Sequence, residues 1–277
     1  MTAAPALSRL SATSDAPRLL CLHHAGGNGA FYADWPAELA GVCEVWTANL
    51  PGRRVRSHEP LITNSDLLVA ELADAAEALL DRPLAIFGHS MGALLGYEVA
   101  RELRHRGCPP LGALVVSACR APGIPSPRPP VPRSDAELVE HLRSWGGTPP
   151  ELLADQEFLG LALPPLRADL LLCDAYRHRP GSPLDTPLTA LAAPDDDEAP
   201  MRDVAAWSSH STQWRGIHAV AGGHFYLIRA RRLVIDIVVR AVKDGLRRLE
   251  PTSTGPAAPG LPGPRNTAAE TRPGRRG

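Results

Sequence analysis

The fold of this chain is decided by residues 84–100, which read LAIFGHSMGALLGYEVA. An apolar run that predicts a strand comes first, and a segment with helical periodicity comes last. Between them lies GHSMG at residues 88–92, a Gly-x-Ser-x-Gly sequence. Such a strand-to-helix turn is sharp enough to need glycine on both sides, and it holds the serine on strained backbone with its hydroxyl exposed. We therefore expect Ser90 to be a nucleophile.

Outward from this turn, short apolar runs alternate with longer helical patterns. The alternation predicts a parallel sheet flanked by helices, and 277 residues with 44% apolar content suit one domain of the α/β class. Right-handed connections wind these units into a single, doubly wound sheet. Strands are expected at residues 18–22, 42–50, 84–87, 111–118, 187–192 and 216–220. Helices are expected at residues 31–39, 65–80, 91–106, 201–208 and 226–249, with Ser65 and Asp66 capping the second.

The two ends of the chain and one internal stretch break this alternation. Residues 1–17 are expected to be a flexible N-terminus, residues 18–249 the folded domain, and residues 250–277 a disordered tail rich in proline and glycine. Residues 121–133 hold six prolines, and the helical pieces after them contain no strand. This length predicts an insertion above the carboxyl edge of the sheet, a lid over about residues 121–179. An ordinary helical excursion is the alternative.

Charge and hydropathy exclude two classes of partner. The net charge of −1 leaves no basic excess to neutralise phosphates, so we expect no nucleic-acid binding. The N-terminus lacks an apolar core of signal-peptide length, and no apolar run is long enough to span a membrane. We therefore expect a soluble, cytoplasmic protein that does not bind membranes.

The cysteines are odd in number and scattered through apolar runs, which predicts reduced, mostly buried thiols in a reducing compartment. No Cys-x-x-Cys spacing suggests zinc. The pair His23-His24 predicts no metal site either, because adjacent residues of a strand point to opposite faces. The cysteines are Cys21, Cys43, Cys108, Cys119 and Cys173.

A serine nucleophile needs a histidine to take its proton and a carboxylate to orient that histidine. With this kind of turn, the order along the chain is serine, acid, histidine. His224 is the best-placed histidine, because it follows a predicted strand and the Gly222-Gly223 turn and precedes the last helix. The acid is expected from Asp195-Asp196-Asp197-Glu198, directly after the strand at 187–192, and spacing alone does not choose among the four.

Backbone N–H groups from two loops are expected to hold the negatively charged oxygen of the reaction intermediate. One donor is the N–H of Met91, the residue after the nucleophile. The other is expected from the segment His23-His24-Ala25-Gly26-Gly27 after the first predicted strand. Its glycines let the backbone approach a substrate closely.

Further motifs surround these residues in a fixed order. They are HAGG at 24–27 followed by Phe31-Tyr32 and Trp35, PGR at 51–53, GHSMG at 88–92, GGTP at 146–149, LRAD at 166–169 and GGHF at 222–225. Over about Leu19 to Leu249, the chain resembles the type II thioesterases that accompany modular polyketide synthases and nonribosomal peptide synthetases. A series of motifs is far more specific than the serine turn alone.

The resemblance implies an α/β-hydrolase fold with a helical lid and a Ser-Asp-His triad. The family pattern Gly-x-x-Asp after the penultimate strand corresponds to residues 193–196, which makes Asp196 the acid. Ala193 stands where the family has glycine, so Asp195 and Asp197 remain alternatives.

The family's oxyanion hole implies that the N–H of Ala25 joins the N–H of Met91. His23 stands where the family often has proline, which affects the detail of the loop rather than its chemistry.

For activity, the resemblance implies hydrolysis of acyl groups from the phosphopantetheine thiol of acyl or peptidyl carrier proteins, an editing role that frees blocked synthases. His224 would deprotonate Ser90, and the same histidine would activate the water that releases the acyl group. No metal or cofactor is expected, because the phosphopantetheine belongs to the substrate. A monomer is expected.

Three other functions share these residues. A general carboxylesterase would hydrolyse oxygen esters faster than thioesters, and an acyltransferase would pass the acyl group to an alcohol or amine. A non-catalytic accessory protein would bind carriers without needing Ser90.

Carrier proteins are commonly acidic, so basic side chains near the mouth of the site would aid encounter. Arg53, Arg54 and Arg56 follow a predicted strand, and Arg128 and Arg133 flank the proline-rich stretch. We expect some of these to contact the carrier, with solvated surface arginines as the alternative.

Overall fold

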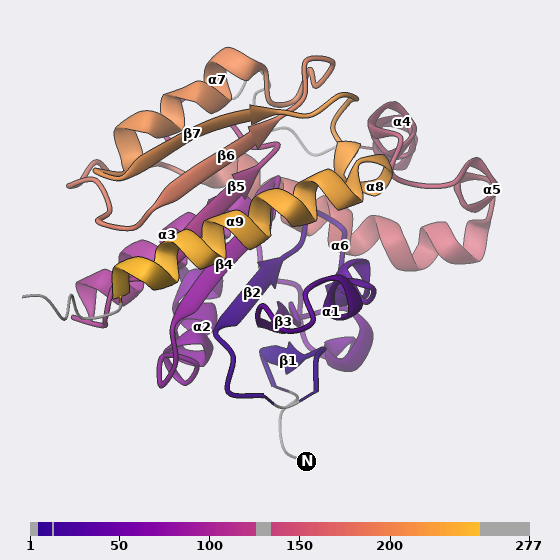
Figure 1. Ribbon diagram of the computed structural model, residues 1–277. Helices are drawn as coiled ribbons and strands as arrows, with labels where there is room; N and C mark the ends of the chain where they lie inside the picture. The colour runs from indigo at the N-terminus through magenta and orange to yellow at the C-terminus, as the bar shows by residue number, and fades with distance from the viewer. Residues whose placement is uncertain (1–4, 13, 126–133, 250–277) are drawn as a thin grey trace, which may run out of the picture.

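The computed structural model describes residues 5–12, 14–125 and 134–249, which form a seven-stranded sheet in the order β1-β3-β2-β4-β5-β6-β7 (Figure 1). β1 pairs antiparallel with β3, and the other neighbouring pairs are parallel, which confirms the predicted fold class. The predicted tail at 250–277 and residues 126–133 of the predicted lid lie outside the described residues. The strands are β1 (Leu7–Arg9), β2 (Arg18–Leu22), β3 (Glu44–Ala48), β4 (Leu84–His89), β5 (Ala113–Ser117), β6 (Leu188–Ala192) and β7 (Trp214–Ala219).

Helices fill the connections between the strands. None of those described is both long and apolar enough to cross a membrane. The α-helices are α1 (Trp35–Glu38), α2 (Ser65–Glu77), α3 (Met91–His105), α4 (Asp135–Trp145), α5 (Pro150–Leu153), α6 (Gln156–Ala175), α7 (Met201–Ala205), α8 (Tyr226–Arg229) and α9 (Arg231–Leu249). Short 3-10 helices are η1 (Gly29–Tyr32), η2 (Arg54–Arg56) and η3 (Ala206–His210).

Helices cover both faces of the sheet, so its central strands are apolar on both sides. In β2, Leu19 and Cys21 belong to the core that α1 and α9 share, and α9 crosses the front of the sheet in Figure 1. The alternate residues Leu20 and Leu22 belong to the core under α2 and α3 on the opposite face. This two-sided burial explains why the strands read as continuous apolar runs.

The N-terminus differs from the prediction. The sequence predicts a flexible segment over residues 1–17, but within it Leu7–Arg9 form β1 at the edge of the sheet, where Leu7 pairs with Ala48 of β3. A strand of three residues is too short to show a period in the sequence. Pairing with β3 fixes it instead.

Two helix ends also differ from the prediction. The cap of α2 is Asn64 rather than Ser65 or Asp66, because the Asn64 side chain accepts the N–H groups of Asp66 and Leu67 at 2.8 and 3.2 Å. The helix expected at 226–249 is divided into α8 and α9 at Ala230, which leaves helical geometry at φ −100° and ψ 25°.

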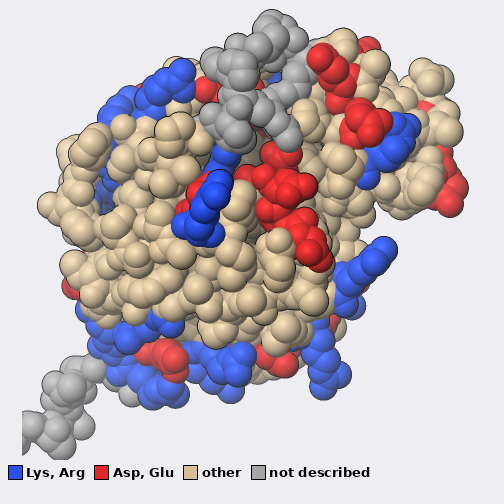
Figure 2. Space-filling view, turned by 90° about the horizontal axis from the view of Figure 1, so that it is seen from above, with Lys and Arg blue, Asp and Glu red and all other residues tan. Residues whose placement is uncertain are grey.

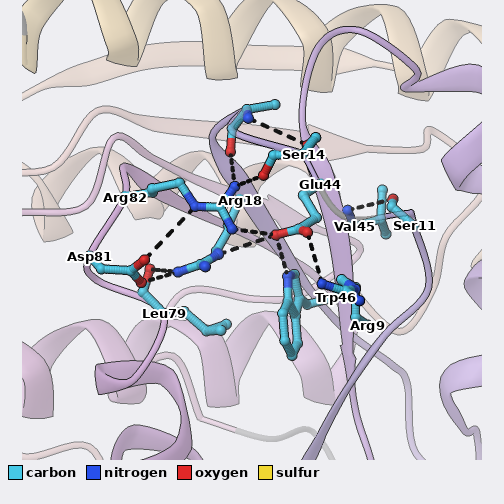
Figure 3. Close-up of polar contacts among 11 residues, drawn as sticks. Arg9, Ser11, Ser14, Arg18, Glu44, Val45, Trp46, Leu79, Asp81 and Arg82 are labelled. Carbon is cyan, nitrogen blue, oxygen red and sulfur yellow. Dashed lines mark hydrogen bonds and ion pairs between the residues drawn. The ribbon is translucent and has the colours of Figure 1, made fainter.

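A buried carboxylate ties the amino ends of the strands together (Figure 3). Glu44, the first residue of β3, is 0% exposed and accepts Nε of Arg18 at 3.2 Å and Nη2 of Arg82 at 2.9 Å. The indole N–H of Trp46 at 3.1 Å and Nη1 of Arg9 at 3.4 Å complete its contacts. Burial alone would raise the pKa of Glu44, but the Trp46 N–H and the guanidinium groups hold that pKa below its ordinary value of 4.5.

Residues 134–175, between β5 and β6, form a helical insertion made of α4, α5 and α6. A capping box between Ser134 and Glu137 begins α4, and a left-handed Gly146 ends it. The two halves of α6 differ in burial, because Leu161 is 74% exposed whereas Leu166 is 1% exposed. The insertion is therefore anchored to the domain through the second half of α6.

Candidate active site

The carboxyl ends of three strands bring Ser90, Asp196 and His224 together. Ser90 follows β4, Asp196 follows β6 and His224 follows β7. His224 Nε2 lies 3.0 Å from Ser90 Oγ, and His224 Nδ1 lies 3.0 and 2.9 Å from the two carboxylate oxygens of Asp196. The three predicted residues therefore form one hydrogen-bonded line.

Ser90 sits on the strained turn that the GHSMG sequence predicts. Its backbone has φ +54° and ψ −122°, a conformation that residues other than glycine rarely adopt. A Cβ on Gly88 would lie 2.2 Å from the carbonyl oxygen of Gly92, and a Cβ on Gly92 would lie 2.1 Å from that of Leu22. Both positions need glycine, because β4, α3 and the end of β2 meet there with no room for a side chain.

Local hydrogen bonds distinguish Asp196 from its acidic neighbours. Oδ1 of Asp196 accepts the backbone N–H groups of Glu198 at 2.9 Å and Ala199 at 3.2 Å, and the residue is 3% exposed. Asp195 and Asp197 are exposed. The turn that points Asp196 at His224 therefore turns the two competing carboxylates into solvent.

The residues of the two expected N–H donors line one cavity with Ser90. Met91 is the first residue of α3, Ala25 lies in the loop after β2, and both line the same cavity as Ser90 and His224. Within the part of the chain that the structure describes, neither of these N–H groups has a hydrogen-bond acceptor. Both are therefore available to an oxygen bound in front of Ser90, and the positive end of the α3 dipole lies at Met91.

A cavity of about 920 Å³ opens in front of this line of residues. The helical insertion supplies one wall through Trp145, Leu170 and Cys173, and the loop after β5 supplies another at residues 118–125. The Trp145 ring lies 5.7 Å from the His224 ring. The helical insertion therefore contributes part of the cavity wall in front of the site.

Three other histidines lie close to the site as neutral groups. Burial lowers the pKa of His23 to about 4, and burial and neighbouring histidines lower the pKa of both His24 and His89 well below 6.5. His89 Nδ1 lies 2.9 Å from Ser117 Oγ, so it packs behind the turn. Among the described residues no cluster of three or more metal-ligating side chains occurs, and none of the cysteines there forms a disulfide bond.

Two of the arginines that we expected near the mouth of the site are buried instead. Arg53 and Arg56 are 9% and 6% exposed because both are ion-paired inside the domain, whereas Arg54 between them is exposed. Arg128 and Arg133 lie outside the described residues. The 3-10 helix η2 turns neighbouring arginines of this loop in different directions, so that some are buried and others exposed. The sequence of the loop has no periodic pattern that would predict this difference.

Acidic side chains gather near the middle of the face that Figure 2 shows from above, and basic side chains lie mostly toward its margins. The exposed carboxylates of Asp195 and Asp197 add negative charge directly beside the buried Asp196. The surroundings of the site are therefore not uniformly basic.

Sequence reasoning gave no role to Asp169, which the structure places 1% exposed beside the loop after β2. Its signal was the LRAD sequence at 166–169, in which a carboxylate falls on the buried side of an apolar helix. A buried acid predicts a partner, but the sequence does not say which.

Residues 17–245 match the family model described as Thioesterase domain. Linear gramicidin dehydrogenase LgrE of Brevibacillus parabrevis is 37% identical over 236 residues, which cover 82% of this chain and 88% of that protein. Thioesterase PikA5 of Streptomyces venezuelae is 38% identical over 218 residues, which cover 78% of this chain and 77% of that protein. The type II thioesterase BorB from the borrelidin biosynthetic cluster aligns in structure with a TM-score of 0.78 at 37% identity, covering 85% of this chain and 97% of that chain.

Proposed function

Because this chain belongs to the thioesterase family, we propose that it hydrolyses acyl groups from the phosphopantetheine arm of carrier proteins in polyketide or nonribosomal peptide biosynthesis. The observation that carries the proposal is the line from Asp196 through His224 to Ser90 at the wall of a cavity of about 920 Å³. A cavity of this size is large enough for an acyl group and the end of the arm that bears it.

In the proposed mechanism, Ser90 attacks the carbonyl carbon of the thioester while His224 Nε2 takes its proton. Asp196 keeps Nδ1 of His224 protonated and stabilises the imidazolium that forms. The carbonyl oxygen becomes negative, and the N–H groups of Ala25 and Met91 hold it.

Collapse of this intermediate breaks the carbon–sulfur bond, and His224 gives the proton to the departing thiolate, which leaves as a thiol. His224 then deprotonates a water molecule, which attacks the acyl group on Ser90. A second intermediate collapses to the free acid and restores the Ser90 hydroxyl. This route asks for no metal or cofactor of the protein, and the phosphopantetheine leaves with the carrier.

The decisive experiment measures kcat/KM for a panel of acyl groups, each presented on a carrier protein and on a small thiol. We expect hydrolysis of both, faster from the carrier, and loss of both in Ser90→Ala. No hydrolysis of any thioester by the wild-type protein would overturn the proposal.

The same panel separates the alternatives. Faster cleavage of the matching oxygen esters would indicate a general carboxylesterase, and acyl transfer to an added alcohol or amine in preference to water would indicate an acyltransferase. Full cellular function of Ser90→Ala would indicate an accessory protein that binds carriers without catalysis.

Dehydrogenase activity, which the name of LgrE states, is not favoured for this chain. The sequence contains no Gly-x-Gly-x-x-Gly, the glycine pattern that binds a dinucleotide after a first strand. The loop after β2 instead contributes Ala25 to the cavity that Ser90 lines.

Editing of blocked synthases is part of the proposal. Editing predicts that short or misprimed acyl groups on a carrier are removed faster than full-length intermediates. We also propose that the protein acts as a monomer, which sedimentation velocity at micromolar concentration would test.

A further inference from the structure

A buried ion pair at the carboxyl edge contacts the loop that contains Ala25. The carboxylate of Asp169 on α6 receives both terminal nitrogens of Arg53, with Nη1–Oδ2 at 2.6 Å and Nη2–Oδ1 at 2.8 Å. Oδ2 also accepts the backbone N–H of Gly26 at 2.7 Å. Nη1 of Arg53 donates to the carbonyl oxygen of Gly27 at 3.3 Å. One carboxylate therefore joins the helical insertion to the loops that follow β2 and β3.

The same loop fixes where the N–H of Ala25 points. The carbonyl oxygen of His24 accepts the N–H of Gly27 at 3.0 Å and lies 2.9 Å from Nδ1 of His23. In a trans peptide the carbonyl and the N–H point in opposite directions, so the N–H of Ala25 points away from these partners. On the other side of Ala25, Asp169 holds the next amide of the chain. Ala25 is thus fixed from both sides.

Helix α6 also touches this loop directly. Gly26 has φ +74°, and a Cβ there would lie 3.1 Å from Cβ and Cδ1 of Leu166, one turn before Asp169. The loop and the helix are therefore in close contact, and a shift of α6 would move the loop. Leu170 and Cys173, on the next turn, line the cavity.

We propose that Asp169, held by Arg53, is a positioning residue that sets the direction of the Ala25 N–H toward the reacting carbonyl oxygen. The inference rests on the proposed function, because it assigns the Ala25 N–H to the oxyanion of that reaction. The helical insertion then does more than line the cavity, since it also orients one of the two oxyanion donors.

The charge of Asp169 explains why Arg53 accompanies it in holding the Gly26 N–H. An unpaired carboxylate at this depth would be costly to bury, and the fork of an arginine satisfies both of its oxygens at once. With both oxygens bound, Asp169 has one orientation in which to accept the Gly26 N–H. A neutral acceptor without Arg53 would hold the amide less rigidly.

The test compares Asp169→Asn and Arg53→Lys with the wild type on a small-thiol acyl thioester. Lysine keeps the charge of Arg53 but cannot bind two oxygens in parallel. Because loss of one oxyanion donor lowers kcat about 10²- to 10³-fold, we expect misdirection of that donor to lower kcat about 10- to 100-fold with KM changed less than about three-fold. Arg56→Lys is the matched control, since Arg56 is also buried and ion-paired but contacts Glu59 and Glu71 instead of the loop.

A second measurement separates positioning from folding. A trifluoromethyl ketone analogue forms an oxyanion on Ser90, whereas the corresponding non-hydrolysable thioether does not. We expect Asp169→Asn to weaken binding of the ketone by the same factor as it lowers kcat/KM. Binding of the thioether should be unchanged.

Equal weakening of both analogues, or a loss of kcat no larger than that in Arg56→Lys, would overturn the inference while leaving the proposed function intact. Inactivity of the wild-type protein on every thioester would overturn the proposed function and this inference with it.

Discussion

Glu44 and Asp169 are two buried carboxylates bound by arginine at opposite edges of the same sheet. Glu44 is 0% exposed at the amino edge, where Arg18 is the first residue of β2 and Arg82 lies just before the neighbouring strand β4 (Figure 3). Asp169 is 1% exposed at the carboxyl edge, and its contacts include the backbone of a site loop as well as Arg53. The two pairs have the same chemistry and differ in what they hold.

The difference follows from the parallel sheet. In such sheets the loops after the carboxyl ends of the strands gather at one edge, where ligands bind. The amino edge receives the starts of the strands, so a charge cluster there joins strands and nothing else. We infer that the Glu44 cluster contributes to stability, whereas the carboxylates at the other edge contribute to the reaction.

The largest expected effect is at Asp196. Replacing it with asparagine keeps the shape but removes the charge that stabilises the imidazolium of His224, so we expect kcat to fall about 10⁴-fold. Steady-state hydrolysis of a small thioester measures it. Asp197→Asn, in the exposed neighbour, is the matched control and should stay within about two-fold of wild type. Equal losses in both variants would mean that the acid was misassigned.

The next largest effect should be on stability, at Glu44. Because Glu44→Gln leaves Arg18 and Arg82 without their buried counter-charge, we expect the free energy of unfolding to fall by about 3–5 kcal/mol. Urea denaturation followed by circular dichroism measures it. At temperatures where the variant is folded, kcat should match that of the wild type.

The control for this prediction is Asp81→Asn, which removes a partner of Arg18 whose side chain is 65% exposed. An exposed ion pair contributes at most about 1 kcal/mol, so its loss should be small. A Glu44→Gln protein that is stable but catalytically impaired would show that the two edges are not separate in function.

A smaller effect should appear as acid sensitivity. The folded pKa of Glu44 lies below 4.5, so as the pH falls the unfolded chain binds its proton first and the folded state loses this contribution. We expect the stability gap between wild type and Glu44→Gln to narrow below about pH 4.5, by up to about 1.4 kcal/mol per pH unit. Denaturation at a series of pH values measures the gap, and a gap that stays constant would contradict the assignment.

The smallest effect should be at the surface of the carboxyl edge. Arg54 is exposed, and reversing its charge by Arg54→Glu should raise KM for an acyl carrier protein about two- to five-fold and leave small thioesters unaffected. Arg247→Glu, near the end of α9 with a side chain 70% exposed, is the control. A rise in KM for both substrates, or for both variants, would remove Arg54 from the carrier interface.

The order of elements and the serine–histidine pair could be predicted from sequence, because each depends on a local signal. The apolar runs mark β2 to β6 since both faces of the sheet are buried there, and the GHSMG turn contains its own geometric requirement for glycine. His224 follows from its place after the last predicted strand.

The remaining features depend on contacts between distant segments. β1 forms because it pairs with the edge of β3, and its three residues are too few to show the alternation that predicts a strand. Asp196 is distinguished from its neighbours by a turn that puts its side chain on the N–H groups of Glu198 and Ala199, which spacing does not encode. The burial of Arg53 needs Asp169 from a helix more than a hundred residues later.

The glycines on either side of Ser90 limit which positions can be changed in order to redirect this protein to other acyl groups. Gly88 and Gly92 are closed to substitution, since the nearest backbone atoms would lie 2.2 and 2.1 Å from any added carbon. Variation belongs in the cavity wall instead, at positions such as Leu170 and Cys173, where a library can reshape the chamber while the nucleophile keeps its place.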